Sequence, residues 1–485
     1  MRAQTKTALL IFTTLSLIYF FSARGGIEVS DTLFSVRTAE AIVNQHSLSL
    51  EECTPGYCYR SHKDGRFYSR YGLGLAFIFA PYVILGKAIA SLSGLPQDRL
   101  INFLISFYNI FFGAGACVVM FYLAQFFRNS QRVSLGLALL LGLGTFCWRY
   151  SAWDFSEVAQ MFFLITAVYC ALRNNLKLLA LGGLSFSCLL LLKILYLAYL
   201  PVFVLYILVN NRRDLKTGLT RAGLFLFTAL PGFWLTLIFN YARFGELLEF
   251  GYGAEAVNFY LSGIKEHAPR LLYWLDKGIF IYNPVFILGI LGYYKLFRMF
   301  RREAVFFFSL ILLNLMLTSS WYGWHGGWSW GPRYMVPFAP LWLLPCFVFF
   351  HRRGAARALV IALIGASCLI QGLSILQGNL EYLSLCNANE QEGLRKGMPA
   401  QIIGSAIMLK HKIAKNDTTY RLSEFGIDSA TIVDTAHFGY YGGFDLWYMK
   451  ASGYFNQPLL RYLPALLLPV IAACLIFLFR LRGAP

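Results

Sequence analysis

The stretch LINFLISFYNIFFGAGACVVMFYLAQFF, residues 100–127, contains no charged side chain. A second stretch without charges covers residues 222–242. A helix needs about 20 mainly apolar residues to cross the hydrocarbon core of a bilayer, and it satisfies its own backbone amides there. Both stretches are therefore predicted to cross a membrane as helices.

The same pattern recurs along the chain. Apolar residues make up 58% of the sequence and charged residues only 14%, against about 25% charged in globular domains. We predict an all-α, polytopic membrane protein with about twelve transmembrane helices. The apolar run nearest the N-terminus, residues 8–21, should remain as a signal anchor, because it lacks a small-residue cleavage site and other spans follow it. The further apolar runs cover residues 8–21, 133–148, 158–172, 178–192, 194–209, 278–294, 304–320, 334–350, 358–375 and 462–479.

The formal net charge of +18 suggests a nucleic-acid partner, but its distribution argues against one. Lys and Arg cluster in alternate short loops, which is the positive-inside pattern of a membrane protein with both termini in the cytoplasm. Of the 24 acidic residues, only Asp214 and Glu303 fall in the predicted cytoplasmic loops. No nucleic-acid partner is expected. The basic loops contain Arg128/Arg132, Arg173/Lys177, Arg212/Arg213/Lys216, Lys295/Arg298/Arg301/Arg302, Arg352/Arg353/Arg357 and Arg480/Arg482.

Residues 73–95 are apolar enough to span, but a span here would reverse every later loop. The run also contains Pro81 and Lys87. We predict an interfacial or re-entrant helix on the outer face, partly buried against the bundle.

The predicted outer loops are long, at about residues 22–99, 243–277, 321–333 and 379–458, and long loops often carry function. No internal repeat is visible, which argues against a transporter with inverted repeats. In the first loop, the cysteines of C53-TPGY-C58 could form a disulfide in an oxidising compartment or remain free thiols. Two cysteines alone do not make a metal site.

Acidic residues follow the first span in GGIEVSDTLFSVRTAEAIVN. Apolar residues recur at helical spacing after Asp31, so Glu28 and Asp31 should lie at the start of an interfacial helix. Asp31 is then either an N-cap or a functional acid, and Glu28 a rim charge or a ligand contact. Asp154 and Glu157 open the predicted fourth span, where they are either interface anchors or markers of a functional cavity.

Two outer segments combine basic and aromatic residues. HKDGRFYSRYGLG, residues 62–74, contains Arg66 and Arg70, which suit phosphate binding or an interfacial belt. WYGWHGGWSWGPRY, residues 321–334, joins aromatic rings for sugar stacking with glycines that allow close approach of the backbone, and we predict a binding site here. Its candidate residues are His325, Trp328, Trp330 and Arg333.

Lys193 is a further charge within an apolar stretch, LLLLKILYLAYLP. A charge at this depth should face a cavity or extend toward the membrane surface.

Five segments in this order resemble the GT-C integral-membrane glycosyltransferases, in the group of the protein O-mannosyltransferases, the lipid A aminoarabinose transferase and the rhizobial lipopolysaccharide sugar transferases. The resemblance covers about residues 8–350, so we divide the chain into a module at 1–350 and C-terminal spans at 351–485, with an outer segment at 379–457. The segments are SDTLF (30–34), DGRFYSRYGLGLAFIFAPYVILG (64–86), FNYARFGELLEFGY (239–252), KGIFIYNPVFILGILG (277–292) and WHGGWSWGPRYMVPFAPLWLLP (324–345).

The resemblance implies a transferase in the inner (plasma) membrane whose active site lies on the outer, periplasmic side. Its donor would be a sugar on a polyprenyl phosphate, its acceptor a glycan, lipid or protein, and transfer would invert the anomeric centre. Asp31 matches the essential acid and Asp154 the second outer acid. Arg243 and Arg333 match the basic positions near the donor phosphate. The family's acids are often adjacent, whereas Glu28 and Asp31 are three residues apart, so the resemblance leaves a divalent metal open.

The chemistry agrees with this assignment. A phosphate leaving group needs Arg, Lys or a divalent ion to stabilise its developing charge, and the acceptor hydroxyl needs a carboxylate base. The same residues also fit two other functions: a transporter or flippase of lipid-linked glycans, and a polymerase or ligase that joins whole glycan units.

Overall fold

The computed structural model describes residues 2–252, 258–327, 329–391, 400–415, 419–427, 431–434, 446–455 and 462–480. Helices dominate, and the only strands in these ranges form two short antiparallel pairs. The predicted all-α class is confirmed.

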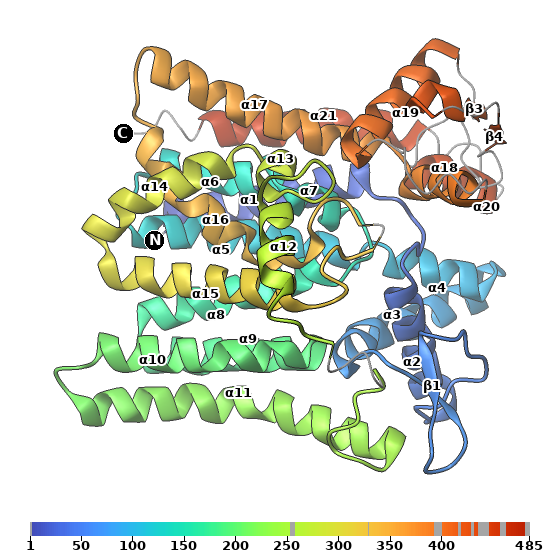
Figure 1. The fold of residues 1–485 in the computed structure, drawn as a ribbon, viewed down its shortest axis with the longest axis horizontal. Coiled ribbons are helices and arrows are strands. Elements are labelled where there is room, and N and C mark those ends of the chain that lie inside the picture. The colour runs from blue at the N-terminus through green and yellow to red at the C-terminus, as the bar shows by residue number, and fades with distance from the viewer. Residues whose placement is uncertain are drawn as a thin grey trace.

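Most helices run side by side in one bundle (Figure 1). Every apolar run predicted to span contains a helix or a row of short helices. Six helices are long and apolar enough to cross a membrane, and several others are shorter or broken, so the count of about twelve stays a prediction. The bundle contains α1 (Arg2–Ser22), α5 (Tyr108–Phe126), α6 (Gln131–Gly144), α8 (Glu157–Arg173), α9 (Leu176–Leu192), α10 (Leu200–Asn210), α11 (Leu215–Phe244), α14 (Phe286–Met299), α15 (Arg301–Ser320), α17 (Ala355–Leu376) and α21 (Leu463–Arg480).

Proline explains one of the broken runs. Residues 334–350 form η3 (Arg333–Phe338), α16 (Ala339–Leu343) and η4 (Leu344–Phe349) in succession. Pro337, Pro340 and Pro345 lie in this row, and each lacks the N–H that a regular helix needs.

Glycines allow the bundle helices to approach closely. A Cβ on Gly232 of α11 would lie 2.1 Å from the carbonyl oxygen of Ser187 on α9. A Cβ on Gly289 of α14 would lie 1.8 Å from the carbonyl oxygen of Trp342. Small residues at helix contacts are typical of membrane bundles, where dispersion rather than water exclusion holds helices together.

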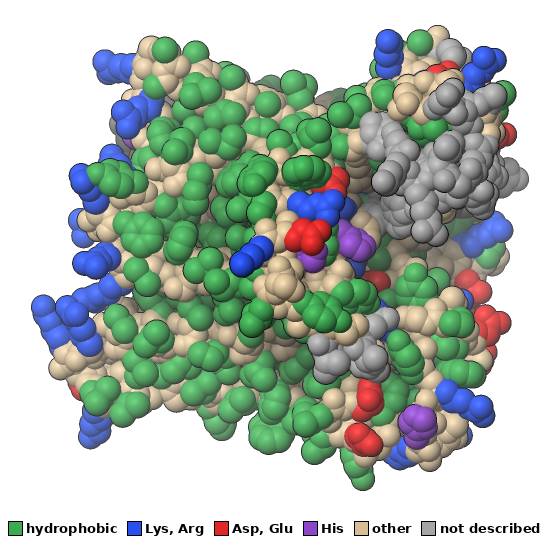
Figure 2. Space-filling view, in the orientation of Figure 1, with side chains coloured by type: hydrophobic (Ala, Val, Ile, Leu, Met, Phe, Trp, Pro, Cys, Tyr) green, Lys and Arg blue, Asp and Glu red, His purple; other side chains and the backbone are tan. Residues whose placement is uncertain are grey.

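The two ends of the bundle differ. Exposed Lys and Arg gather at the end that carries the α10–α11, α14–α15 and η4–α17 turns (left edge of Figure 2). The opposite end carries α2 (Ser30–Gln45), the hairpin β1 (Cys58–Arg60)–β2 (Phe67–Ser69), α3 (Leu73–Ser93), α4 (Gln97–Ile105), α7 (Phe146–Ser151), α12 (Gly263–Tyr273) and α13 (Ile279–Tyr282).

Helix α3 has the composition of a span but packs against α2 and α4 at this second end (Figure 1). Its first residues contact the end of α9, where a Cβ on Gly74 would meet the backbone of Leu191. Nearby, Cys53 and Cys58 form a disulfide, which decides between the two alternatives left open by the sequence.

The C-terminal cap, defined as α18 (Asn379–Gln391), α19 (Gln401–Lys415), β3 (Thr419–Arg421), β4 (Ile432–Asp434) and α20 (Trp447–Tyr454), lies at the same end. It has a small apolar core of its own, while α17 and α21 on either side pack on α6 and α1 of the bundle. The cap core contains Tyr382, Leu385, Cys386, Met408, Tyr420, Leu422, Phe425 and Ile427.

Candidate active site

Asp31 lies in the first turn of α2, where its side chain is 37% exposed. The N-cap of this helix is Val29, so the interpretation of Asp31 as an N-cap is wrong. The hydroxyl of Tyr71 donates a hydrogen bond to Oδ1 of Asp31 at 2.8 Å. A guanidinium nitrogen of Arg333 lies 3.5 Å from Oδ2. Asp31 is thus a half-open carboxylate with a positive charge beside it.

Arg333 begins η3, immediately after the aromatic and glycine-rich loop. Its guanidinium lies over the Phe155 ring, 4.9 Å from the centroid, and donates to the Tyr334 hydroxyl at 2.8 Å. The loop wraps closely around this side chain, because a Cβ on Gly326 would lie 2.8 Å from Cγ of Arg333. The side chain is only 14% exposed.

Glu157 and Lys193 complete the arrangement. Glu157 is the first residue of α8 and is 2% exposed. Its Oε1 lies 3.5 Å from Nζ of Lys193 and 4.0 Å from Nε of Arg333. Lys193 occupies the break between α9 and η1 (Ile194–Tyr199), so its charge faces this site, as expected for a costly charge. Asp31, Glu157, Lys193 and Arg333 form the polar cluster.

Two atoms of the polar cluster are buried and have no hydrogen-bond partner among the described residues: Oε2 of Glu157 and Nε of Arg333. An unpaired buried polar group costs about 1–3 kcal/mol, and more when it is charged. The described residues therefore leave these two polar atoms unsatisfied, which is the condition expected of a site that receives a polar ligand.

Tyr71 was not selected as a site residue from the sequence, although it lies in the RYGLG segment. Burial and the neighbouring Asp31 carboxylate raise the pKa of Tyr71, so the phenol stays protonated and remains a donor. Arg70 lies at the rim, where its guanidinium is 4.7 Å from the centroid of Tyr252.

Arg243 does not face the polar cluster. It donates to the backbone carbonyls of Ser69 and Tyr71 and, at 2.8 Å, to Oδ1 of Asn240. The guanidinium thus holds the strand that leads to Tyr71. Arg243 was predicted to bind the donor phosphate, but its hydrogen bonds go to two backbone carbonyls and the Asn240 side chain.

Asp154 is buried, and its carboxylate bonds to the backbone just before α2. Its Oδ2 accepts hydrogen bonds from the backbone amides of Glu28 at 3.2 Å and Val29 at 3.0 Å. Its backbone carbonyl accepts from the hydroxyl of Thr32 at 2.5 Å. Asp154 therefore braces the segment that leads into α2.

The loop before Arg333 is fixed by Lys277, which was not among the site residues predicted from the sequence. Nζ of Lys277 donates to the carbonyls of Gly327, Ser329 and Gly331, at 3.0, 2.8 and 3.2 Å. In the sequence, the feature that marks Lys277 as a functional residue is its place at the start of the KGIFIYNP segment. Lys277 holds together the stretch that presents Arg333.

Of the loop candidates, His325 is exposed, and its Nδ1 accepts the amide N–H of Gly327 at 2.9 Å. Partial burial and the charges of Lys277 and Arg333 lower the pKa of His325, which favours this neutral acceptor form. Trp330 is buried, packs edge-on against Tyr282 and does not present its face to a ligand. Trp328 lies outside the described residues.

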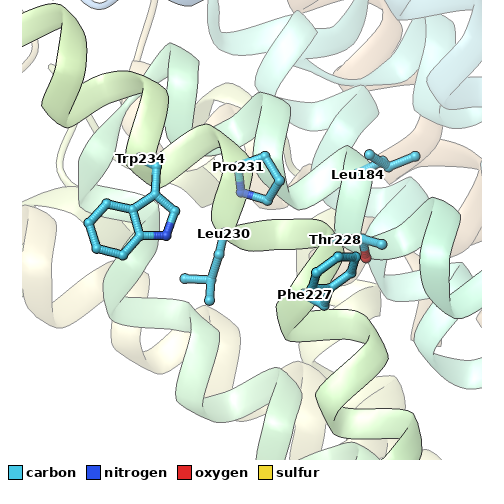
Figure 3. A pocket seen from close by; sticks show the side chains of 6 residues that line it. All are labelled: Leu184, Phe227, Thr228, Leu230, Pro231 and Trp234. Carbon is cyan, nitrogen blue, oxygen red and sulfur yellow. The ribbon is translucent and has the colours of Figure 1, made fainter.

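The remaining candidates lie apart from the polar cluster. Arg66 is exposed in the β1–β2 turn. Glu28 is buried and faces Arg24 and Lys450. Within the described ranges, no group of three or more His, Cys, Asp or Glu side chains is placed to bind a metal. The groove in Figure 3 lies on α9 and α11 around Pro231 and is almost wholly apolar.

No protein-family model and no curated protein matches the chain. Solved structures do match. The oligosaccharyltransferase of Archaeoglobus fulgidus in the apo form is 12% identical, with a TM-score of 0.50 over 81% of this chain and 60% of that one. The same protein tethered to an acceptor peptide with the NVT sequon gives a TM-score of 0.52 at 12% identity, over 80% of this chain and 59% of that one.

The chain has a GT-C fold. The resemblance predicted from the five sequence segments is therefore confirmed at the level of the fold. The chain spans about 60% of the length of the archaeal oligosaccharyltransferase. ArnT from Cupriavidus metallidurans bound to undecaprenyl phosphate also matches, at 16% identity and a TM-score of 0.45, over 84% of this chain and 70% of that one.

Proposed function

We propose that this protein is a glycosyltransferase that takes a sugar from a polyprenyl-phosphate-linked donor and passes it to a hydroxyl acceptor at the outer face of the inner membrane. The observation that carries the proposal is the polar cluster, in which a half-open carboxylate and two cations meet at one end of a GT-C bundle. The polar cluster lies at the end opposite the basic α10–α11, α14–α15 and η4–α17 turns, and the positive-inside rule assigns that end to the outside.

Arg333 and Lys193 would bind the donor phosphate. Both contact carboxylates at 3.5–4.0 Å, longer than a good charge-assisted hydrogen bond of about 2.7–2.9 Å. A phosphate between them would accept shorter bonds and satisfy Nε of Arg333. Arg70 at the rim would attract the anion as it arrives, and Arg243 would act indirectly by holding Tyr71.

Asp31 would be the general base. The acceptor oxygen attacks the anomeric carbon as the bond from that carbon to the phosphate oxygen breaks, and the electron pair leaves with the phosphate. The acceptor proton passes to Asp31, which the hydroxyl of Tyr71 orients. Attack from the side opposite the phosphate inverts the anomeric centre.

A divalent metal does not fit the side chains that the structure describes. They provide no set of three metal ligands, and the two oxygens of Asp31 already face Tyr71 and Arg333. The reaction is therefore written with Arg333 and Lys193 stabilising the leaving group.

Mass spectrometry of cell-surface glycans, glycolipids and glycoproteins, with and without this gene, tests the proposal. We expect one surface species to lose the mass of a single sugar when the gene is deleted, which would identify donor and acceptor together. Loss of a whole glycan, with its lipid-linked form accumulating, would instead indicate a flippase or ligase.

A further inference from the structure

The residues between α1 and α2, 23–29, form a short linker that ends two residues before Asp31. From the bundle side, Asp154 holds the linker through the backbone amides of Glu28 and Val29. The linker contains adjacent glycines, Gly25 and Gly26, which add no side-chain contacts at these two positions. Its position therefore depends on the contacts of its other residues and on what packs against the glycines.

Helix α20 of the C-terminal cap packs on the other side of the linker. The backbone N–H of Trp447 donates to the carbonyl of Ala23 at 2.9 Å, and its indole N–H donates to that of Phe20 at 2.7 Å. The indole also packs on the rings of Phe20, Phe103 and Phe107. A Cβ on Gly25 would lie 2.5 Å from Cβ of Trp447, and φ at Gly25 is +72°, so this contact requires glycine.

A buried ion pair joins the same two segments. Nζ of Lys450 on α20 lies 3.3 Å from Oε1 of Glu28, and the two side chains are 5% and 4% exposed. Arg24 lies 4.0 Å from the same oxygen and donates to the carbonyls of Ser374 and Gln377 where α17 ends. Buried pairs of this kind contribute little net stability but can specify one arrangement of the segments that they join.

We propose that α20 is a positioning element of the active site: Trp447 and Lys450 fix the 23–29 linker and thereby place Asp31 against Tyr71 and Arg333. This inference rests on the proposed function. Glu28 is three residues from Asp31, so a displaced linker moves the start of α2. A misplacement of about 1 Å in a reacting group can lower the rate about 100-fold. The cap thereby takes part in a reaction whose other groups belong to the bundle.

The test uses the full-length protein in detergent or nanodiscs with a synthetic polyprenyl-phosphate sugar. Lys450→Met, Glu28→Gln and the double variant are compared with Lys410→Met, which removes an exposed lysine from α19 of the same cap. Turnover is expressed per donor-binding site, so that a loss of folded protein does not count. The double variant removes both charges of the Lys450–Glu28 pair together, while Arg24 keeps its hydrogen bonds to the carbonyls of Ser374 and Gln377.

We expect turnover per site to fall about 10–100-fold in each single variant and by no more in the double variant, with donor Kd unchanged and Lys410→Met unaffected. Normal turnover in the double variant would overturn the positioning role. A rise in donor Kd that accounts for the whole loss of turnover would overturn it as well. If Asp31→Asn is inactive while Lys450→Met turns over at the normal rate, this inference alone is overturned. Normal transfer by Asp31→Asn would overturn the proposed function as well.

Discussion

Arg333 is a guanidinium buried among aromatic rings and placed between two carboxylates, Asp31 and Glu157. A charge in such surroundings is stable only when paired, and removing its partners costs far more than the pair contributes. The contacts to both carboxylates are long, and no described residue makes a hydrogen bond to Nε. These features make Arg333 the residue whose substitution should report most directly on donor binding.

Arg333→Lys should weaken donor binding on the order of tenfold, because a compact ammonium replaces a planar guanidinium that can donate two parallel hydrogen bonds. One charge-assisted hydrogen bond is worth about 1.5–3 kcal/mol. Binding of a polyprenyl phosphate to purified protein, measured by calorimetry, checks this. Arg66→Lys, an exposed arginine on the β1–β2 turn, is the matched control and should bind normally. Equal affinity in the two variants would remove Arg333 from the phosphate site.

Gly326→Ala should disturb the same side chain through the backbone. Gly326 has φ of +68°, and its new Cβ would meet Cγ of Arg333 at 2.8 Å. A left-handed conformation costs an L-residue about 1–2 kcal/mol, so we expect a lower melting temperature and weaker donor binding. The control is Gly372→Ala, a helical glycine on α17 with no neighbour near its Cβ. Unchanged donor affinity in Gly326→Ala would show that the loop conformation does not set the position of Arg333.

The residue types of the site could be predicted, but not which of them meet. Glu157 and Arg333 were selected because an acid at a span boundary and an arginine in a glycine-rich loop are unusual, and Asp31 because it matches the essential acid of the family that the sequence resembles. Tyr71 gave no signal beyond its place in a motif, since a tyrosine near a membrane surface is common. Asp154 and Arg243 carry the expected charges, but their side chains bond to backbone groups that only the folded chain brings near.

At the scale of elements, the apolar runs predicted the helices well, because a run of about 20 residues without charges has few other solutions in a bilayer. The breaks were harder to predict. The break at Lys193 and the row of short helices after Arg333 both present charged residues to the site. Irregular backbone in a membrane bundle is tolerated where it is buried in protein or lines a cavity, and both breaks lie at the polar cluster.

The loop between α15 and η3 depends on Lys277, whose ammonium joins three backbone carbonyls. Lys277→Met should speed amide exchange at residues 327–331 and weaken donor binding, because these carbonyls lose their shared donor. Hydrogen–deuterium exchange with mass spectrometry checks the first effect. Lys265→Met, at an exposed position on α12, should change neither. If exchange in the loop is the same in both variants, Lys277 does not hold the loop.

At the scale of the whole molecule, charge separates the two ends of the bundle, and the polar cluster lies at the end away from the exposed basic turns. The sequence predicted this polarity through its alternate basic loops. It could not predict that α20, more than 400 residues after α1, packs on the α1–α2 linker. Such a contact depends on tertiary packing between segments that share no local pattern.

Topology can be tested in intact cells with a membrane-impermeant maleimide. Cysteine at position 327 should react without permeabilisation, and cysteine at position 353 only after it, because the positive-inside rule places Arg352 and Arg353 in the cytoplasm. The parent protein sets the background from its native cysteines. Protection of position 327 in intact cells would reverse the orientation and place the site on the cytoplasmic side.

The central claim is that Asp31 removes the acceptor proton, and Asp31→Asn tests it most directly. Asn keeps the size of the side chain and can still accept the hydrogen bond from Tyr71, so the variant should fold and bind donor. General-base catalysis contributes about 10²–10⁴ in rate, so single-turnover transfer from a polyprenyl-phosphate sugar should fall by at least that order. The transfer rate of Tyr71→Phe, which keeps the Asp31 carboxylate, should fall less. Transfer by Asp31→Asn at the normal rate would contradict the account.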